Sequence, residues 1–211
     1  MIKENYQKIL TSLKKDTKLI AVSKGQDIDK IMALYEEGQR DFGENFLQEL
    51  IFKSQNLPKD INWHFLGNIQ SNKAVEIALH SSLIQSVSRK KILDILARSK
   101  VKKVNILLQL KLGNESTKSG FNAEEIQSVL KNKEDYKNIN FSGLMAIAEN
   151  IKNEDQLRLQ FQTAFHLFSS INKNKSNFNI LSMGMTSDFM YALDEGSNMI
   201  RVGTKIFGAR A

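Results

Sequence analysis

Residues 19–43, LIAVSKGQDIDKIMALYEEGQRDFG, contain the pattern that decides the fold. The apolar run at 19–23 has the length and composition of a strand. Residues 27–38 then place apolar side chains at helical spacing, and a second apolar run follows at 40–43. The stretch therefore predicts a strand, a helix and the next strand in direct succession.

The same unit repeats along the whole chain. Further strands are predicted at 63–66, 83–87, 104–110, 141–147, 179–183 and 199–202, and further helices at 46–55, 71–80, 89–99, 123–132, 153–171 and 187–195. Eight strands alternating with helices favour a closed barrel over a doubly wound open sheet, which more often has five or six strands and a glycine-rich first turn. We predict an α/β fold with one (β/α)₈ barrel domain over residues 1–211.

Capping residues support several of these helices. Asp27, Ser71 and Asn122 stand where N-caps are expected, and Glu125 follows Asn122 at the spacing of a capping box. Gly38 follows a predicted helix where a left-handed residue is usual.

Composition narrows the classes of protein. The chain has no cysteine, which excludes disulfides, thiolate metal sites and a cysteine nucleophile. It contains no apolar stretch of the roughly 20 residues that a membrane span needs, and residues 1–15 are too charged for a signal peptide. We expect a cytoplasmic monomer without a membrane partner. The net charge of +7 comes from scattered lysines, often beside glutamate, so we expect no nucleic-acid partner.

Lys24 is the sharpest candidate for chemistry, because functional residues of such barrels lie where strands run into the following loops. A lysine that continues an apolar strand is costly to bury as an ammonium ion. A lowered pKa would leave a neutral amine able to condense with an aldehyde. The ordinary alternative is a lysine that extends past the strand end into solvent.

Two glycine-bearing segments near the C-terminus, SMGMTSD at 182–188 and RVG at 201–203, follow the seventh and eighth strands. Barrels commonly bind phosphate with these two loops. Hydroxyls, free N–H groups and a helix starting near Ser187 could enclose a phosphate, although each segment alone could be an ordinary turn. Together with Lys24, they suggest a phosphorylated aldehyde as the ligand.

The chain resembles the pyridoxal phosphate homeostasis proteins, which are similar to the barrel domain of alanine racemase without its second domain. The resemblance covers nearly the whole chain and rests on AVSK (21–24), FGEN (42–45), WHFLGNIQSNK (63–73), KSG (118–120), GLMAI (143–147), SMGMTSD (182–188) and RVGTKIFGAR (201–210). It implies that pyridoxal 5′-phosphate (PLP) is the cofactor and that Lys24 carries it as a Schiff base.

The resemblance also assigns the other cofactor-binding residues. Asn45 and Met145 are expected to line the ring, and Arg201 to face the pyridine nitrogen. The expected phosphate contacts are Ser182, Thr186, Ser187, Gly203 and Thr204. The sequence departs from the family at Gly25 and Gln26, where threonine and lysine are frequent, at Asn68, where proline is common, and at Thr186, where serine is usual.

An arginine beside the pyridine nitrogen disfavours its protonation and so weakens the ring as an electron sink. Alanine racemases also take a second proton-transfer residue, a tyrosine, from their additional domain, and no tyrosine of this chain follows a predicted strand. We therefore expect no catalytic residue and a protein that holds or delivers PLP, with apo PLP-dependent enzymes or B6 vitamers as partners. The alternative is a PLP-dependent amino-acid racemase.

Two further candidates rank lower. His64 ends a predicted strand near the proposed site, and the three histidines show no metal-ligand spacing. Lys118 belongs to a loop after the fifth strand that could close over the cofactor or simply turn the chain.

Overall fold

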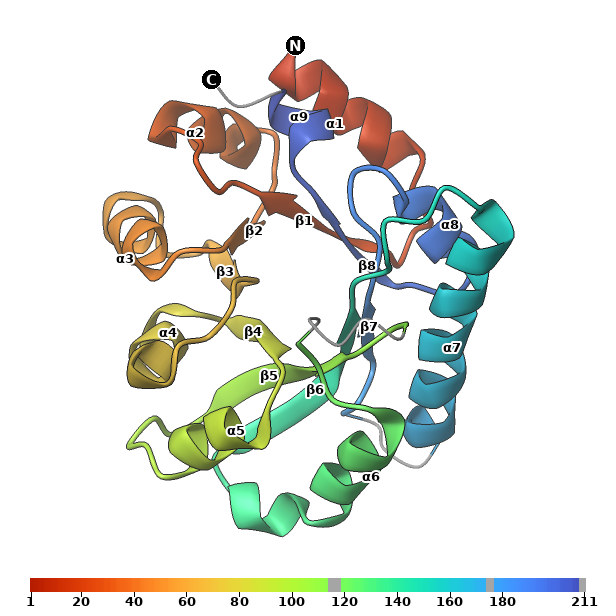
Figure 1. The fold of residues 1–211 in the computed structure, drawn as a ribbon. Coiled ribbons are helices and arrows are strands. Elements are labelled where there is room, and N and C mark those ends of the chain that lie inside the picture. The colour runs from red at the N-terminus through yellow and green to blue at the C-terminus, as the bar shows by residue number, and fades with distance from the viewer. Residues whose placement is uncertain (114–118, 174–176, 209–211) are drawn as a thin grey trace.

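Eight parallel strands close into a barrel in the computed structural model, which describes residues 1–113, 119–173 and 177–208 (Figure 1). The strands are β1 (Lys18–Val22), β2 (Asp41–Glu44), β3 (Asn62–Phe65), β4 (Leu83–Val87), β5 (Val104–Leu110), β6 (Ile139–Ala146), β7 (Ile180–Ser182) and β8 (Met199–Val202). Each strand pairs with the next, and β8 returns to β1 with Met199 opposite Lys18 and Val202 opposite Ala21. The predicted fold class is confirmed.

Helices surround the barrel, as Figure 1 shows. They are α1 (Ile2–Thr11), α2 (Ile28–Glu36), α3 (Leu47–Asn56), α4 (Ala74–His80), α5 (Lys90–Ala97), α6 (Ala123–Lys131), α7 (Glu154–Asn172), α8 (Phe189–Asp194) and α9 (Thr204–Phe207), with 3₁₀ turns η1 (Ser71–Lys73) and η2 (Lys133–Tyr136). All seven helices predicted between strands are present. The short helix α9, which contacts α1 through a bond from Asn5 to the Ile206 carbonyl, was not predicted.

The predicted caps have mixed outcomes. Asn122 forms the expected capping box, since its side chain accepts from the Glu125 N–H and the Glu125 carboxylate accepts from the Asn122 N–H, both at 2.8 Å. Asp27 is the N-cap residue of α2, as predicted, but its exposed side chain makes no capping bond. Ser71 was wrong as a cap, because the 3₁₀ turn η1 already begins at that residue.

The core has two compartments. A large outer core lies between the strands and the helices, and Phe161 of α7 is completely buried in it. A small apolar cluster inside the barrel consists of Ile20, Leu83, Leu107, Met145 and Met199. The remaining interior positions include polar side chains, whose arrangement bears on the site. No helix in the described parts of the chain is long and apolar enough to cross a membrane.

Candidate functional site

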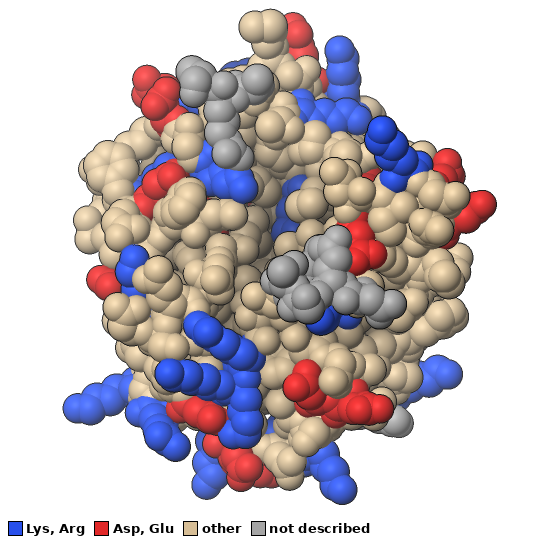
Figure 2. Space-filling view, in the orientation of Figure 1, with Lys and Arg blue, Asp and Glu red and all other residues tan. Residues whose placement is uncertain are grey.

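A cavity of about 300 Å³ opens at the carboxyl ends of the strands. Figure 2 shows this face hollowed at its centre, with Lys or Arg atoms inside the hollow and charges of both signs around the rim. The cavity is lined by Val22, Lys24, Gln26, Asn45, Leu66, Met145, Ile147, Met185, Thr186, Ser187, Arg201, Gly203, Thr204 and Gly208. Its volume lies at the lower end of the range for small-molecule sites.

The structure brings eight of the nine predicted site residues to this cavity. They are Lys24, Asn45, Met145, Thr186, Ser187, Arg201, Gly203 and Thr204. They come from β6 and β8, from the loops that follow β1, β2, β7 and β8, and from the first residue of α9, which explains why residues far apart in the sequence share one wall. Strand-end reasoning works here because parallel strands deliver their carboxyl ends to a single face.

Ser182 is the predicted residue that does not line the cavity. It is completely buried at the end of β7, where its hydroxyl accepts a 2.6 Å bond from Arg201 and donates a 2.6 Å bond to Gln85. With its hydroxyl proton used inside the barrel, Ser182 contacts Arg201 rather than the cavity. Its hydroxyl therefore lies beneath Arg201 and outside the cavity lining, where a phosphate contact was expected.

Lys24 lies two residues beyond β1, half-buried in the wall of the cavity. Hydrogen bonds to residues of α3 fix the main chain on both sides of Lys24. Lys53 donates to the Ser23 carbonyl at 2.8 Å, and the Gly25 N–H donates to the Glu49 carboxylate at 2.7 Å. Gly25 adopts a left-handed conformation with φ of 68°, which a side chain would disfavour. The sequence departure at Gly25 therefore fits the shape of this loop.

A buried ionic cluster of Glu44, Glu49 and Lys53 makes these contacts. Lys53 bonds to Glu44 at 2.9 Å and to Glu49 at 2.7 Å, and its side chain is only 4% exposed. Burial raises the pKa of Glu44 to about 7, although Lys53 and the Ser23 hydroxyl both oppose the change. For Glu49, burial acts in the same direction but is outweighed by Lys53 and Gly25, so its pKa is lowered.

Arg201 of β8 is the buried cation of the cavity, 4% exposed. Its two terminal nitrogens donate to neutral acceptors, namely the Ser182 hydroxyl at 2.6 Å and the Ala146 carbonyl at 2.9 Å. Burial lowers the pKa of Arg201 to about 10, against the attraction of Asp188, so the group remains a cation at neutral pH. It can donate a charge-assisted hydrogen bond to a ligand but cannot accept one.

Hydroxyl groups occupy the side of the cavity formed by the loops after β7 and β8. Thr186 and Ser187 lie in the loop after β7, Thr204 is the first residue of α9, and the Gly203 N–H donates to the Thr186 hydroxyl at 3.3 Å. Helix α8 begins at Phe189, slightly later than predicted. Neutral donors of this kind, next to a backbone N–H, suit an anionic oxygen group.

Sequence reasoning missed several lining residues. The apolar part of the cavity wall includes Leu66, Met185 and Ile147. Their residue types do not distinguish them from residues of the core. The glycine of WHFLG gave an indirect signal, because a side chain at Gly67 would lie 2.0 Å from the Asn45 carbonyl oxygen. This glycine lets the loop after β3 approach Asn45 closely.

The lower-ranked candidates lie elsewhere. His64 is buried inside the barrel, bonded to Asp41 and Gln85, and does not line the cavity, so its expected position near the site was wrong. Within the described ranges, no group of three His, Asp or Glu residues could hold a metal ion. Lys118 lies outside the described residues.

Comparison with known proteins identifies the family of this chain. The family model described as "Alanine racemase, N-terminal domain" matches residues 1–211. The pyridoxal phosphate homeostasis protein of Haemophilus influenzae is 37% identical, with 97% of this chain and 92% of that protein covered. The protein of the same name from Synechocystis is 38% identical, with 97% of both chains covered.

Solved structures show the same fold. PipY of Synechococcus elongatus with PLP bound has a TM-score of 0.89 and 32% identity, and 99% of this chain and 100% of that chain are covered. Alanine racemase from E. faecalis has a TM-score of 0.80 at 16% identity and is matched over 57% of its length, which shows a shared fold alone. The chain belongs to the alanine racemase N-terminal domain family and, within it, to the pyridoxal phosphate homeostasis proteins.

Proposed function

We propose that this protein binds PLP in the cavity as a Schiff base on Lys24, and that it holds or delivers the cofactor without turning over a substrate. The observation that carries the proposal is the placement of one lysine amine, one buried arginine and a group of hydroxyls around a single cavity. These residues match the aldehyde, the ring nitrogen and the phosphate of PLP. The PLP-bound PipY structure supports the same ligand.

Each part of the cavity has a proposed task. Thr186, Ser187, Gly203 and Thr204 bind the phosphate, a set that leaves out Ser182 because its hydroxyl faces the barrel interior. The wall on the ring side is formed by Asn45 and Met145. The cofactor, when bound, supplies an aldehyde for covalent attachment and an electron-withdrawing ring.

Arg201 argues against turnover. A permanent cation beside the pyridine nitrogen disfavours protonation of that nitrogen, which leaves the ring a weak electron sink. All four tyrosines lie within the described residues, and none of them lines the cavity: Tyr6, Tyr35, Tyr136 and Tyr191. The curated relatives are also named as homeostasis proteins rather than as enzymes. Apo PLP-dependent enzymes and B6 vitamers are the partners that this role implies.

Covalent attachment is tested by visible absorbance and borohydride reduction. The purified protein with PLP should absorb in the visible range, lose that band on reduction and carry the added mass on the peptide that contains Lys24. Lys24→Ala should abolish the band, whereas Lys100→Ala, at an exposed position, should leave it unchanged. A colourless wild-type protein in excess PLP would overturn the proposal.

The racemase alternative predicts proton exchange at the α-carbon of an amino acid. The PLP-loaded protein would be incubated with single enantiomers in deuterated water and assayed for deuterium incorporation and racemisation. Sustained turnover would replace the carrier function with an enzymatic one, whereas its absence supports the carrier.

A further inference from the structure

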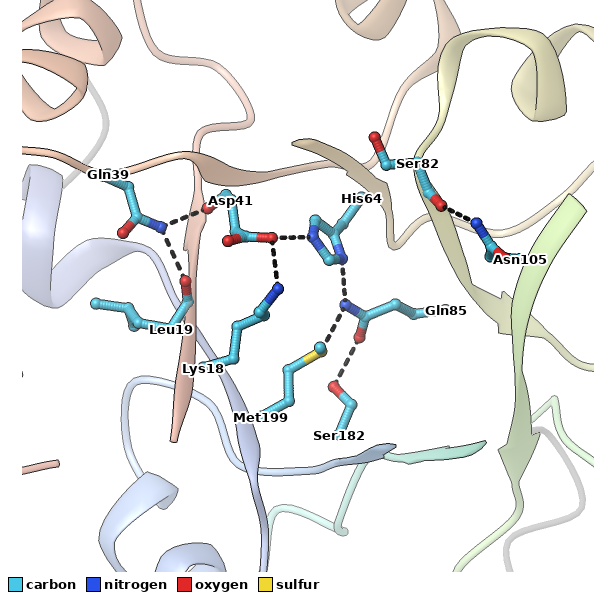
Figure 3. A network of polar contacts seen from close by, with 10 residues as sticks. All are labelled: Lys18, Leu19, Gln39, Asp41, His64, Ser82, Gln85, Asn105, Ser182 and Met199. Carbon is cyan, nitrogen blue, oxygen red and sulfur yellow. Dashed lines mark hydrogen bonds and ion pairs between the residues drawn. The ribbon is translucent and has the colours of Figure 1, made fainter. Parts of the chain in front are cut away.

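A continuous row of polar side chains crosses the inside of the barrel beneath Arg201. Asp41, His64, Gln85 and Ser182, here called the interior chain, come from four different strands, and Figure 3 shows them pointing toward one another. The bonds measure 2.9 Å from His64 to Asp41, 3.0 Å from Gln85 to His64 and 2.6 Å from Ser182 to Gln85. A last bond of 2.6 Å joins Ser182 to Arg201.

The interior chain runs from one end of the barrel to the other. Asp41 is the first residue of β2, at the end opposite the cavity, and it also contacts Lys18, the first residue of β1, at 3.3 Å. Arg201 lies at the other end and lines the cavity. Gln85 and Ser182 between them are completely buried.

Arg201 fixes the direction of every bond in the row, because a guanidinium only donates. Ser182 must therefore accept from Arg201, and its proton must go to the Gln85 carbonyl oxygen. This turns the Gln85 amide nitrogen toward Nδ1 of His64, which has to accept. His64 is consequently a neutral imidazole with its proton on Nε2, donated to Asp41.

Because all the bonds of the interior chain run in one direction, their dipoles act together on Arg201. Each member presents its negative end toward Arg201: the Ser182 oxygen, the Gln85 carbonyl and the His64 lone pair. In a low-dielectric interior, such bonds polarise one another. The Arg201 charge is thus stabilised by oriented dipoles that lead to the Asp41 carboxylate at the far end of the barrel.

A glutamine at the centre of a barrel needs an explanation, since such interiors are usually filled by branched apolar side chains. Ile20, Leu83 and Leu107 fill neighbouring positions in this way. Gln85 can serve as both acceptor and donor in one side chain, and so connects a hydroxyl to an imidazole. An apolar residue would leave Ser182 without its acceptor and His64 without its donor.

We propose that Gln85, with His64 and Asp41 behind it, is the positioning residue that sets the orientation of the Arg201 guanidinium at the cavity. The part that concerns bound PLP rests on the proposed function. The part that concerns the direction of the bonds does not, because it holds for the protein without ligand.

The test combines nitrogen-15 NMR of the ligand-free protein with PLP binding. Gln85→Leu removes the bonds to Ser182 and His64 and the 3.3 Å contact from the Gln85 amide nitrogen to the Met199 sulfur. Gln85→Glu keeps the acceptor for Ser182 and replaces only the amide nitrogen that contacts His64 and Met199. Gln39→Leu is the matched control, because Gln39 is also a buried glutamine, but its amide donates to the main-chain carbonyls of Leu19 and Asp41 and not to the Asp41 carboxylate that bonds to His64. The NMR signals of Arg201 and of the His64 ring report orientation and tautomer directly.

We expect wild-type His64 to carry its proton on Nε2. Gln85→Leu should shift the Arg201 signals, change the absorbance band of bound PLP and raise its dissociation constant about tenfold, as expected for loss of a well-oriented charged hydrogen bond. Gln85→Glu should keep the orientation of Arg201 and the PLP affinity, while Nδ1 of His64 gains a proton and Nε2 keeps its own, so that the ring donates to a carboxylate on each side. Gln39→Leu should change none of these readouts.

Three results would overturn the proposal. One is a wild-type His64 protonated on Nδ1, which needs no variant to detect. The second is a Gln85→Leu protein whose Arg201 signals and PLP affinity match those of Gln39→Leu. The third is a Gln85→Glu protein that behaves like Gln85→Leu. Failure of the wild-type protein to bind PLP would overturn the proposed function instead, and the NMR measurements would still decide the role of Gln85.

Discussion

Glu44→Gln should make the stability of this protein less dependent on pH. Glu44 is completely buried behind the Lys24 loop, and one of its oxygens accepts from Ser23 and from Lys53. The other oxygen, Oε2, has no hydrogen-bond partner within the described residues. Burial is the largest influence on this carboxyl and raises its pKa from 4.5 to about 7.

The sign of the effect follows from proton binding. The folded protein holds the Glu44 proton more tightly than the unfolded chain does, so this contribution to stability is complete below pH 4.5 and is lost as pH rises toward 7. The interval between the two pKa values corresponds to about 3 kcal/mol. Relative to Glu44→Gln, the wild-type free energy of unfolding should therefore fall by about 3 kcal/mol between pH 4.5 and about 7.5.

Urea unfolding at several pH values, at constant ionic strength, measures this difference. The fluorescence of Trp63, the single tryptophan and 4% exposed, reports the transition. Subtracting the free energy of unfolding of the variant from that of the wild type at each pH removes the contributions of other titrating groups. Glu124→Gln, at an exposed position of α6, shows what the same substitution does without burial. A difference that is flat or that rises with pH would mean that Lys53 keeps Glu44 ionised, and it would refute the reasoning.

Three other substitutions test separate parts of the structure. Asn122→Ala removes the N-cap of α6 and should lower the free energy of unfolding by about 1 kcal/mol in urea titrations; no loss would contradict the capping box. Phe161→Ala leaves a cavity in the outer core and should cost about 3 to 5 kcal/mol by the same measurement, and a cost below about 1 kcal/mol would show that the site collapses around the gap. In Gly67→Ala the new methyl group would clash with the Asn45 carbonyl, so PLP affinity measured by absorbance titration should fall. Unchanged affinity would show that the close approach of Gly67 to Asn45 does not affect the cavity.

Much of the fold could be predicted because the barrel uses short, uniformly apolar strands. Each predicted strand overlaps an observed one, and the eight fall in chain order around the barrel. Helix α9 could not be found in this way, since four residues, Thr204–Phe207, are too few to show a helical period. Its position depends on packing against α1, a contact between the two ends of the described chain.

The cavity was predictable where a residue follows a strand and harder where it lies within one. Ser182 ends a strand of only three residues, so its sequence neighbours do not reveal that the side chain faces the barrel interior. Gln85 in the run LIQSV was a signal that went unused, because a polar residue in a fully buried strand needs partners. Lys53 follows Glu49 by four residues, a spacing that is typical of an exposed ion pair on a helix. The sequence does not show that Lys53 is buried, because its contact with Glu44 of β2 forms only in the folded barrel.

Strand β2 carries two carboxylates, one that leads to Arg201 and one behind the Lys24 loop, and their pKa values are shifted in opposite directions. Asp41 and Glu44 are three residues apart, so they face opposite sides of the strand: Asp41 begins the row that leads to Arg201, and Glu44 pairs with Lys53 behind Lys24. Burial alone would raise the pKa of Asp41, but His64 and Lys18 lower it, so its contribution to stability is lost as pH falls through that lowered value. The contribution of Glu44 is lost as pH rises. A fall of pH below the ordinary range of an aspartate therefore weakens the support of Arg201, whereas a rise of pH from 4.5 toward 7 weakens the support of the Lys24 loop.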